Sequence, residues 1–232
     1  MLYMPCLGFV PMTYTNSKKI LTISLAAIFG IAMIASPIGA EAMGSFLDVK
    51  NTKVKTDSSE VEKANFSTKG KIPTDGTGGA FGFGYITGAG VEAIAVTTTH
   101  SGIQDSVAQV DADDPVFHNH YVALTDANPL CNELAVVDIT FQEPGDVDIV
   151  NKKAIMEDIP YNFIGTHSLS GDTVTFSADA NVGAAVSFTI GPVDKEGNPT
   201  LNPAEIIDDG AVCINDVAFV DDLSVRSVSH RQ

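Results

Sequence analysis

Three histidines within 21 residues are the part of this sequence whose side chains are best suited to chemistry. His118 and His120 stand two positions apart in a segment rich in β-branched residues, and His100 ends the preceding segment of that kind. Residues two apart on a strand project from the same face, so the His118 and His120 rings would point the same way. Imidazole nitrogens are ligands of Zn²⁺ and Cu²⁺. The spacing therefore predicts a transition-metal site made of His100, His118 and His120.

The convergence of these rings depends on how two predicted strands pair. If residues 91–100 and 116–124 pair antiparallel, His100 returns to the end of the sheet where His118 and His120 stand. The segment between the strands carries four aspartates whose carboxylates could hold the second ring nitrogens. They are Asp105, Asp111, Asp113 and Asp114.

A structural role for the histidines is the alternative. Val116, Val122 and Leu124 share the face of His118 and His120, so the rings could be half-buried and bonded to the backbone. Calcium is a second cation option, since Asp111–Asp114, Asp208–Asp209 and Asp221–Asp222 supply hard oxygen ligands without a twelve-residue loop pattern.

Catalysis has little support in the sequence. Ser101 follows His100 directly, and neighbouring residues on a strand point to opposite faces. No Gly-x-Ser-x-Gly motif is present. The glycines between Gly76 and Gly90 lack the following helix that a phosphate-binding loop needs. We therefore predict no catalytic and no cofactor-binding residues, and the sequence favours a protein that is not an enzyme.

The segments that must position the histidines alternate with a period of two and are separated by turn signals. This pattern predicts an all-β fold, a β-sandwich of two antiparallel sheets, over residues 80–225. Within it, residues 173–177 and 186–190 are expected to form a hairpin. Residues 43–79 are polar and predict a flexible arm, and residues 226–232 predict a disordered tail.

The N-terminal 42 residues have the order of a secretory signal peptide. Lys18 and Lys19 precede an apolar run, Ile20–Ala35, and Ala40-Glu-Ala42 provides small residues at a cleavage site after Ala42. The run is shorter than the roughly 20 residues that span a bilayer. The pattern predicts a secreted or cell-envelope protein whose mature chain has no membrane span, with an uncleaved N-terminal anchor as the alternative.

Cys131 and Cys213 follow the predicted cleavage site. In an exported protein an isolated pair of cysteines predicts a disulfide bond. Cleavage would also remove Lys18, Lys19 and Glu41, changing 13 Lys+Arg and 29 Asp+Glu to 11 and 28, a net charge of −17. Such a chain repels phosphate backbones and anionic membranes and attracts cations, which excludes nucleic acid as a partner.

The stretch from Ala95-Val-Thr-Thr-Thr-His100 to Asp114-Pro-Val-Phe-His-Asn-His120, with Cys131 and Cys213 beyond it, resembles uncharacterised secreted archaeal proteins. The resemblance covers about the last two thirds of the chain and implies no activity. Two main hypotheses follow, and a third, weaker one is a metal-dependent enzyme, which would need an open coordination position and a base beside it. The first is a metal-binding domain that uses His100, His118 and His120 for copper or zinc. The second is a structural or interaction module of the cell envelope with no metal.

Overall fold

The structure is a computed structural model that describes residues 44–228. The predicted signal peptide and the last four residues of the predicted tail lie outside this range. About half of the described chain is strand and very little of it is helix, which confirms the all-β class. Its two short helices are the 3₁₀ turn η3 (Gly90–Glu92) and α1 (Pro203–Ile207). Among residues 44–228 there is no helix with the length and apolar character needed to cross a membrane.

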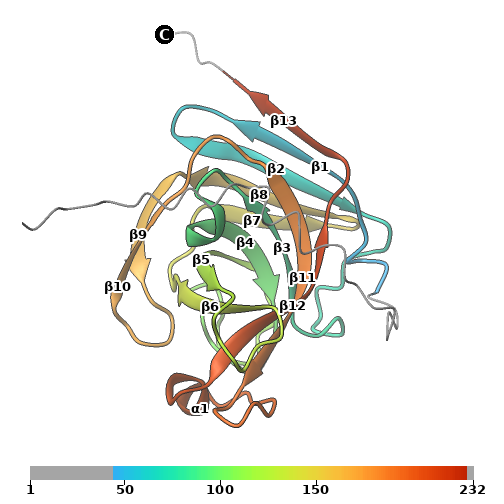
Figure 1. Ribbon diagram of the computed structural model, residues 1–232. Coiled ribbons are helices and arrows are strands. Elements are labelled where there is room, and N and C mark those ends of the chain that lie inside the picture. Colours follow the sequence, from blue (N-terminus) through green and yellow to red (C-terminus); the bar gives the residue numbers. More distant parts are fainter. Residues whose placement is uncertain (1–43, 229–232) are drawn as a thin grey trace, which may run out of the picture. The chain divides into compact units, whose positions relative to one another are not determined.

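Six strands close into a barrel in the order β11-β12-β6-β5-β4-β3, with β3 pairing back to β11 (Figure 1). They are β3 (Phe81–Ile86), β4 (Ile94–Thr99), β5 (His118–Thr125), β6 (Leu134–Ile139), β11 (Ala184–Val193) and β12 (Ala211–Phe219). All six pairings are antiparallel. The prediction of a sandwich was therefore wrong in architecture, because one sheet closes on itself through the β3–β11 pairing.

A five-stranded sheet has the order β13-β1-β2-β8-β7 (Figure 1). Its strands are β1 (Val49–Thr56), β2 (Glu60–Thr68), β7 (Asp146–Val150), β8 (Lys153–Pro160) and β13 (Leu223–Ser227). The pairing of β13 with β1 is parallel, and the other three are antiparallel. Since β13 extends through Ser227, the predicted tail boundary at residue 226 was also wrong.

Residues 43–79 were predicted to form a flexible arm, but they contain β1 and β2, two inner strands of this sheet. Val54, Val61, Ala64 and Phe66 alternate with polar residues along the two strands and are buried. Such a half-buried strand needs few large apolar residues, because only one face is covered. The polar side chains of these two strands lie mainly on the other face of the sheet.

The hairpin predicted between residues 173–177 and 186–190 is not formed. The first segment is β10 (Thr173–Ser177), which pairs with β9 (Asn162–Thr166) in a separate two-stranded sheet. The second lies in β11, which pairs with β3 and β12. Both segments are strands as predicted, but they belong to different sheets.

Two apolar clusters organise the fold, one inside the barrel and one between the barrel and the five-stranded sheet. The interior cluster contains Ile94, Val96, Val122, Val186, Phe188 and Ile214. In the other, Phe83 and Tyr85 of β3 join Phe66 and Met156 of the five-stranded sheet. Every residue of β4 is buried, because one face lines the interior and the other lies under the sheet.

The β3 strand shows why its glycines alternate with aromatic residues. Phe81, Phe83 and Tyr85 point to the five-stranded sheet, so Gly82 and Gly84 face the barrel interior. A Cβ added at Gly82 would lie 2.6 Å from the Thr97 carbonyl oxygen and 2.7 Å from the Phe188 ring. The narrow interior therefore requires glycine where β3 passes Phe188.

The predicted disulfide bond between Cys131 and Cys213 is confirmed. Cys213 lies on β12 opposite Ala135 of β6, and Cys131 precedes β6, with 5.3 Å between the cysteine Cα atoms. The bond therefore reinforces the β6–β12 pairing, which has two register pairs. It joins positions separated by 82 in the sequence, and cross-linking so long a loop restricts the unfolded chain strongly.

We expect the double substitution Cys131→Ser with Cys213→Ser to lower the free energy of unfolding by about 2–5 kcal/mol, because the unfolded chain regains its loop entropy. Denaturant unfolding followed by far-UV circular dichroism measures this loss. A reductant should destabilise the wild type and leave the double variant unchanged. Equal stability of the two oxidised proteins would contradict the assignment.

Candidate metal centre

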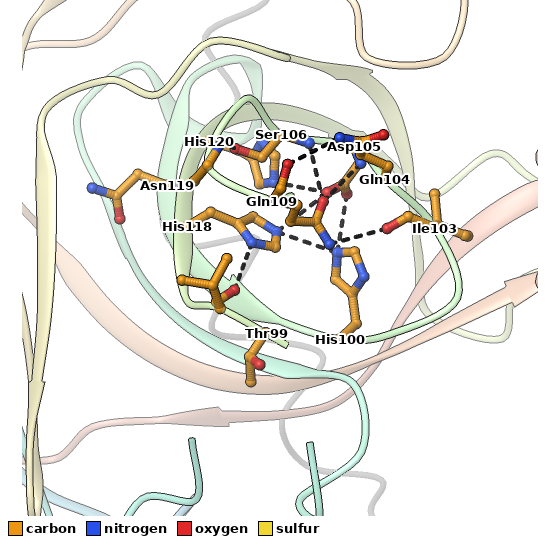
Figure 2. A network of polar contacts seen from close by, with 12 residues as sticks. Thr99, His100, Ile103, Gln104, Asp105, Ser106, Gln109, His118, Asn119 and His120 are labelled. Atoms are coloured by element: carbon orange, nitrogen blue, oxygen red, sulfur yellow. Dashed lines mark hydrogen bonds and ion pairs between the residues drawn. The ribbon is translucent and has the colours of Figure 1, made fainter. Parts of the chain in front are cut away.

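Antiparallel pairing of β4 with β5 brings the three histidines to one end of the barrel interior, as the sequence predicted. Thr98 lies opposite His118 and Val96 opposite His120, so both rings share the inward face with Ile94 and Val96. His100 follows directly after β4. Asn119, between the two histidines of β5, points away from the cluster (Figure 2).

The histidine rings converge with the carboxylate of Asp105 (Figure 2). His100 Nε2 lies 3.2 Å from His118 Nε2 and 3.1 Å from Asp105 Oδ2. Asp105 Oδ1 lies 3.2 Å from His118 Nε2 and 3.6 Å from His120 Nε2. His100, Asp105 and His118 each offer one ligand atom, and these three atoms lie within 4.8 Å of one another. The three residues could therefore hold a metal ion. His120 adjoins this trio through Asp105.

The second nitrogen of two rings is held by the backbone. His118 Nδ1 lies 2.8 Å from the Val116 carbonyl oxygen, and His120 Nδ1 lies 2.6 Å from that of Thr140. A carbonyl oxygen only accepts, so each Nδ1 carries the hydrogen and donates it. In the neutral rings, Nε2 is then the nitrogen with a free lone pair, and both Nε2 atoms face Asp105. Such outer hydrogen bonds orient metal-binding imidazoles in proteins.

Asp105 is the residue whose role the sequence did not predict. We expected the aspartates of the loop to hold the second ring nitrogens, but Asp105 lies on the Nε2 side and the backbone holds the Nδ1 atoms of His118 and His120. Its position five residues after His100 was a usable signal, since a strand-end histidine and a nearby loop carboxylate can reach one site.

Burial makes the electrostatics of this cluster strong. His118 and His120 have no exposed surface, and the Asp105 side chain is 14% exposed. Burial alone would raise the pKa of Asp105, but the charge on His120 and the polar contacts with the His100 and His118 rings outweigh it and hold that pKa well below its usual value. Asp105 is therefore an anion in the interior, where an unpaired charge is costly.

The two β5 histidines differ in their affinity for a proton. Burial lowers the pKa of His118, so its ring is neutral at neutral pH. Burial also acts to lower the pKa of His120, but attraction to Asp105 and the Thr140 carbonyl raise it above its usual value. In the metal-free protein, a proton on His120 therefore supplies positive charge that a metal ion would supply when bound.

Gln109 anchors the loop that carries Asp105 (Figure 2). Its Oε1 accepts the backbone N–H groups of Asp105 and Ser106, at 2.9 and 3.2 Å. Its Nε2 donates to the carbonyl oxygens of Ile103 and Asp114, at 3.1 and 3.3 Å. Gln109 is buried and uses both ends of its amide, so it fixes the backbone on which the Asp105 carboxylate is presented.

The other acidic segments do not form a comparable group. Asp111 accepts the N–H of Asp113, and Asp114 accepts those of Val110 and Val116, so these carboxylates shape the loop. In the part of the chain that the structure describes, no other cluster of His, Cys, Asp or Glu meets the same distance criterion as His100, Asp105 and His118. The calcium alternative therefore has no gathered ligand set within residues 44–228.

Comparisons with protein-family models, curated proteins and solved structures found no match to this chain. The resemblance to secreted archaeal proteins stays a prediction from the sequence. The side chains of the cluster are therefore the basis for assigning a function.

The ionic cluster should make the stability of the metal-free protein depend on pH. The contribution of Asp105 is fully present above its unfolded pKa, about 4, and is lost as the pH falls through its lower folded pKa. That of His120 is fully present below its unfolded pKa, about 6.5, and is lost as the pH rises through its higher folded pKa. We expect the destabilisation caused by Asp105→Asn to be largest between about pH 4 and pH 6.5.

Chemical denaturation of chelator-treated wild type and Asp105→Asn across this pH range measures the difference. Asp111→Asn is the matched control, because Asp111 is an exposed carboxylate of the same loop. A loss of stability in Asp105→Asn that is the same at every pH would contradict the ionic role of Asp105.

Proposed function

We propose that this protein is an exported, non-enzymatic domain that binds a divalent transition-metal ion, Zn²⁺ or Cu²⁺, with His100, Asp105 and His118 as ligands. A single observation carries the proposal. His118 Nε2, His120 Nε2 and Asp105 Oδ1 face one another at the end of the barrel, while the hydrogens of the two rings are committed to backbone carbonyls. Groups that face one another in this way in a buried site need positive charge between them, which a proton on His120 supplies in the metal-free protein and a metal ion would supply when bound.

The distances support an ion of the size of Zn²⁺ or Cu²⁺. With bonds of about 2.0–2.1 Å, the ligand atoms of a tetrahedral zinc site stand about 3.3 Å apart. Three of the contacts among His100, Asp105 and His118 measure 3.1–3.2 Å. Little movement of the side chains is therefore needed to place an ion among them.

The donor atoms support the same class of ion. Two imidazoles and one carboxylate are ligands of borderline divalent ions, whereas Cu(I) prefers sulfur. The mature chain's two cysteines, Cys131 and Cys213, are joined to each other. Calcium takes six to eight oxygen ligands, and this cluster offers one carboxylate.

Export is supported by the N-terminal sequence pattern and by the disulfide bond, since such bonds persist in oxidising compartments. The net charge of −16 for the whole chain suits a protein that attracts cations. The imidazole and carboxylate donor atoms, rather than the net charge of the chain, determine which ion is preferred.

We expect tag-free wild-type protein, loaded with Zn²⁺ or Cu²⁺ and then dialysed, to keep about one ion per chain, which corresponds to one ligand set. His118→Ala and Asp105→Asn each remove one of three ligands and should retain less than about a tenth of that amount. Elemental analysis by mass spectrometry and titration calorimetry measure the stoichiometry and the loss of affinity.

Two control variants make this test specific. His167→Ala removes a histidine whose Nδ1 accepts two N–H groups in a turn after β9, and Asp111→Asn removes an exposed carboxylate of the Asp105 loop. Both should retain the wild-type amount of metal. The proposal is wrong if wild type binds no ion, or if all four variants retain equal amounts.

Export predicts a defined N-terminus for the mature protein. Cleavage after Ala42 would leave Met43 as the first residue, because Ala40 and Ala42 supply the small residues that signal peptidase requires. N-terminal sequencing of the protein recovered outside the producing cell measures this. An intact Ile20–Ala35 segment in membrane-bound protein would support the anchored alternative.

A further inference from the structure

We infer that His120 is a fourth ligand and closes the coordination shell, so that the ion is held in a structural site with no position for a substrate. This inference rests on the proposed function and deepens it. Three protein ligands with an open fourth position are typical of catalytic zinc sites, and four protein ligands are typical of structural ones. The role of His120 therefore decides which of these two classes the site belongs to.

His120 has the properties of a ligand rather than of a core residue. Its side chain is fully buried, and its Nδ1 donates to the Thr140 carbonyl at 2.6 Å. Its Nε2 has no hydrogen-bond partner and lies 3.6 Å from Asp105 Oδ1. In the metal-free protein a proton on this nitrogen would face the Asp105 carboxylate, and an ion bound in place of the proton would satisfy both groups.

Four contacts among these residues have lengths close to the edge of a tetrahedral zinc site. Asp105 contacts all three Nε2 atoms at 3.1–3.6 Å, and His100 Nε2 lies 3.2 Å from His118 Nε2. These four contacts scatter about the edge of roughly 3.3 Å expected for tetrahedral zinc. His120 is not among the residues whose ligand atoms all lie within 4.8 Å of one another, so coordination would draw its ring towards the other three.

The surroundings of His120 also suit a closed site. The residue opposite it on β4 is Val96, and the next inward-facing residue of β5 is Val122, both in the apolar interior cluster. On the other side lies the loop that carries His100 and Asp105, and both of these residues contact the His118 ring. A four-ligand ion would therefore tie this loop to β5 and stabilise the end of the barrel.

Cobalt is a suitable probe, because Co²⁺ takes zinc sites and its visible spectrum reports its coordination. We expect Co²⁺-loaded wild type to have a tetrahedral spectrum that does not change when azide is added. His120→Ala keeps the other three ligands, so it should bind Co²⁺ at least about tenfold more weakly. Its spectrum should change with azide, and free imidazole should restore the wild-type spectrum.

The outcomes separate the inference from the proposed function. Absence of Co²⁺ from wild type would overturn both. Binding by wild type with a spectrum that responds to azide would overturn the closed site alone and leave metal binding in place. Unchanged affinity of His120→Ala, with no response to azide, would show that His120 is not a ligand. The azide titration of wild type needs no variant, so it decides the matter even if His120→Ala does not fold.

Discussion

The antiparallel pairing of β4 with β5 is the interaction on which the candidate metal centre depends. It places Thr98 opposite His118 and Val96 opposite His120, and this register turns both rings of the His-Asn-His segment into the barrel. A shift of one residue would send both rings to the opposite face and put Asn119 inside. His100 reaches the same end of the barrel because it is the first residue after β4. The strand pairing therefore determines the spacing of the histidine nitrogens.

The closed barrel gives these polar groups an environment in which they attract a cation. His118 and His120 are fully buried, and the apolar cluster of the barrel interior begins beside them with Val96 and Val122. Interactions between charges are strong where water is excluded. The depressed pKa of Asp105 and the raised pKa of His120 have the same origin, a carboxylate and an imidazole that each need the other's charge. A divalent ion would neutralise the Asp105 carboxylate in the same way as a protonated His120, with twice the positive charge.

The loop between β4 and β5 is ordered by its own hydrogen bonds as well as by the cluster. Gln109 bonds at four points to the backbone around Asp105 and Asp114. Val107 N–H also donates to the Phe141 carbonyl, which fastens the loop near the Thr140 carbonyl that holds His120. Asp105 is thus presented by a loop with a defined shape, and less conformational entropy is lost when an ion is bound.

Local alternation and residue type were enough to predict the all-β class, the shared face of His118 and His120, and the pairing of Cys131 with Cys213, whereas the approach of His100 to the other two histidines required the antiparallel pairing of β4 with β5. The tertiary structure decided the closure of the barrel through β3 and β11, the use of residues 49–68 as inner strands, and the place of Asp105 on the Nε2 side of the rings. A period of two shows which face of a strand is buried, whereas the partner of that face is selected by packing between distant segments. The position of a loop carboxylate depends in addition on bonds such as those of Gln109, which have no periodic signal in the sequence.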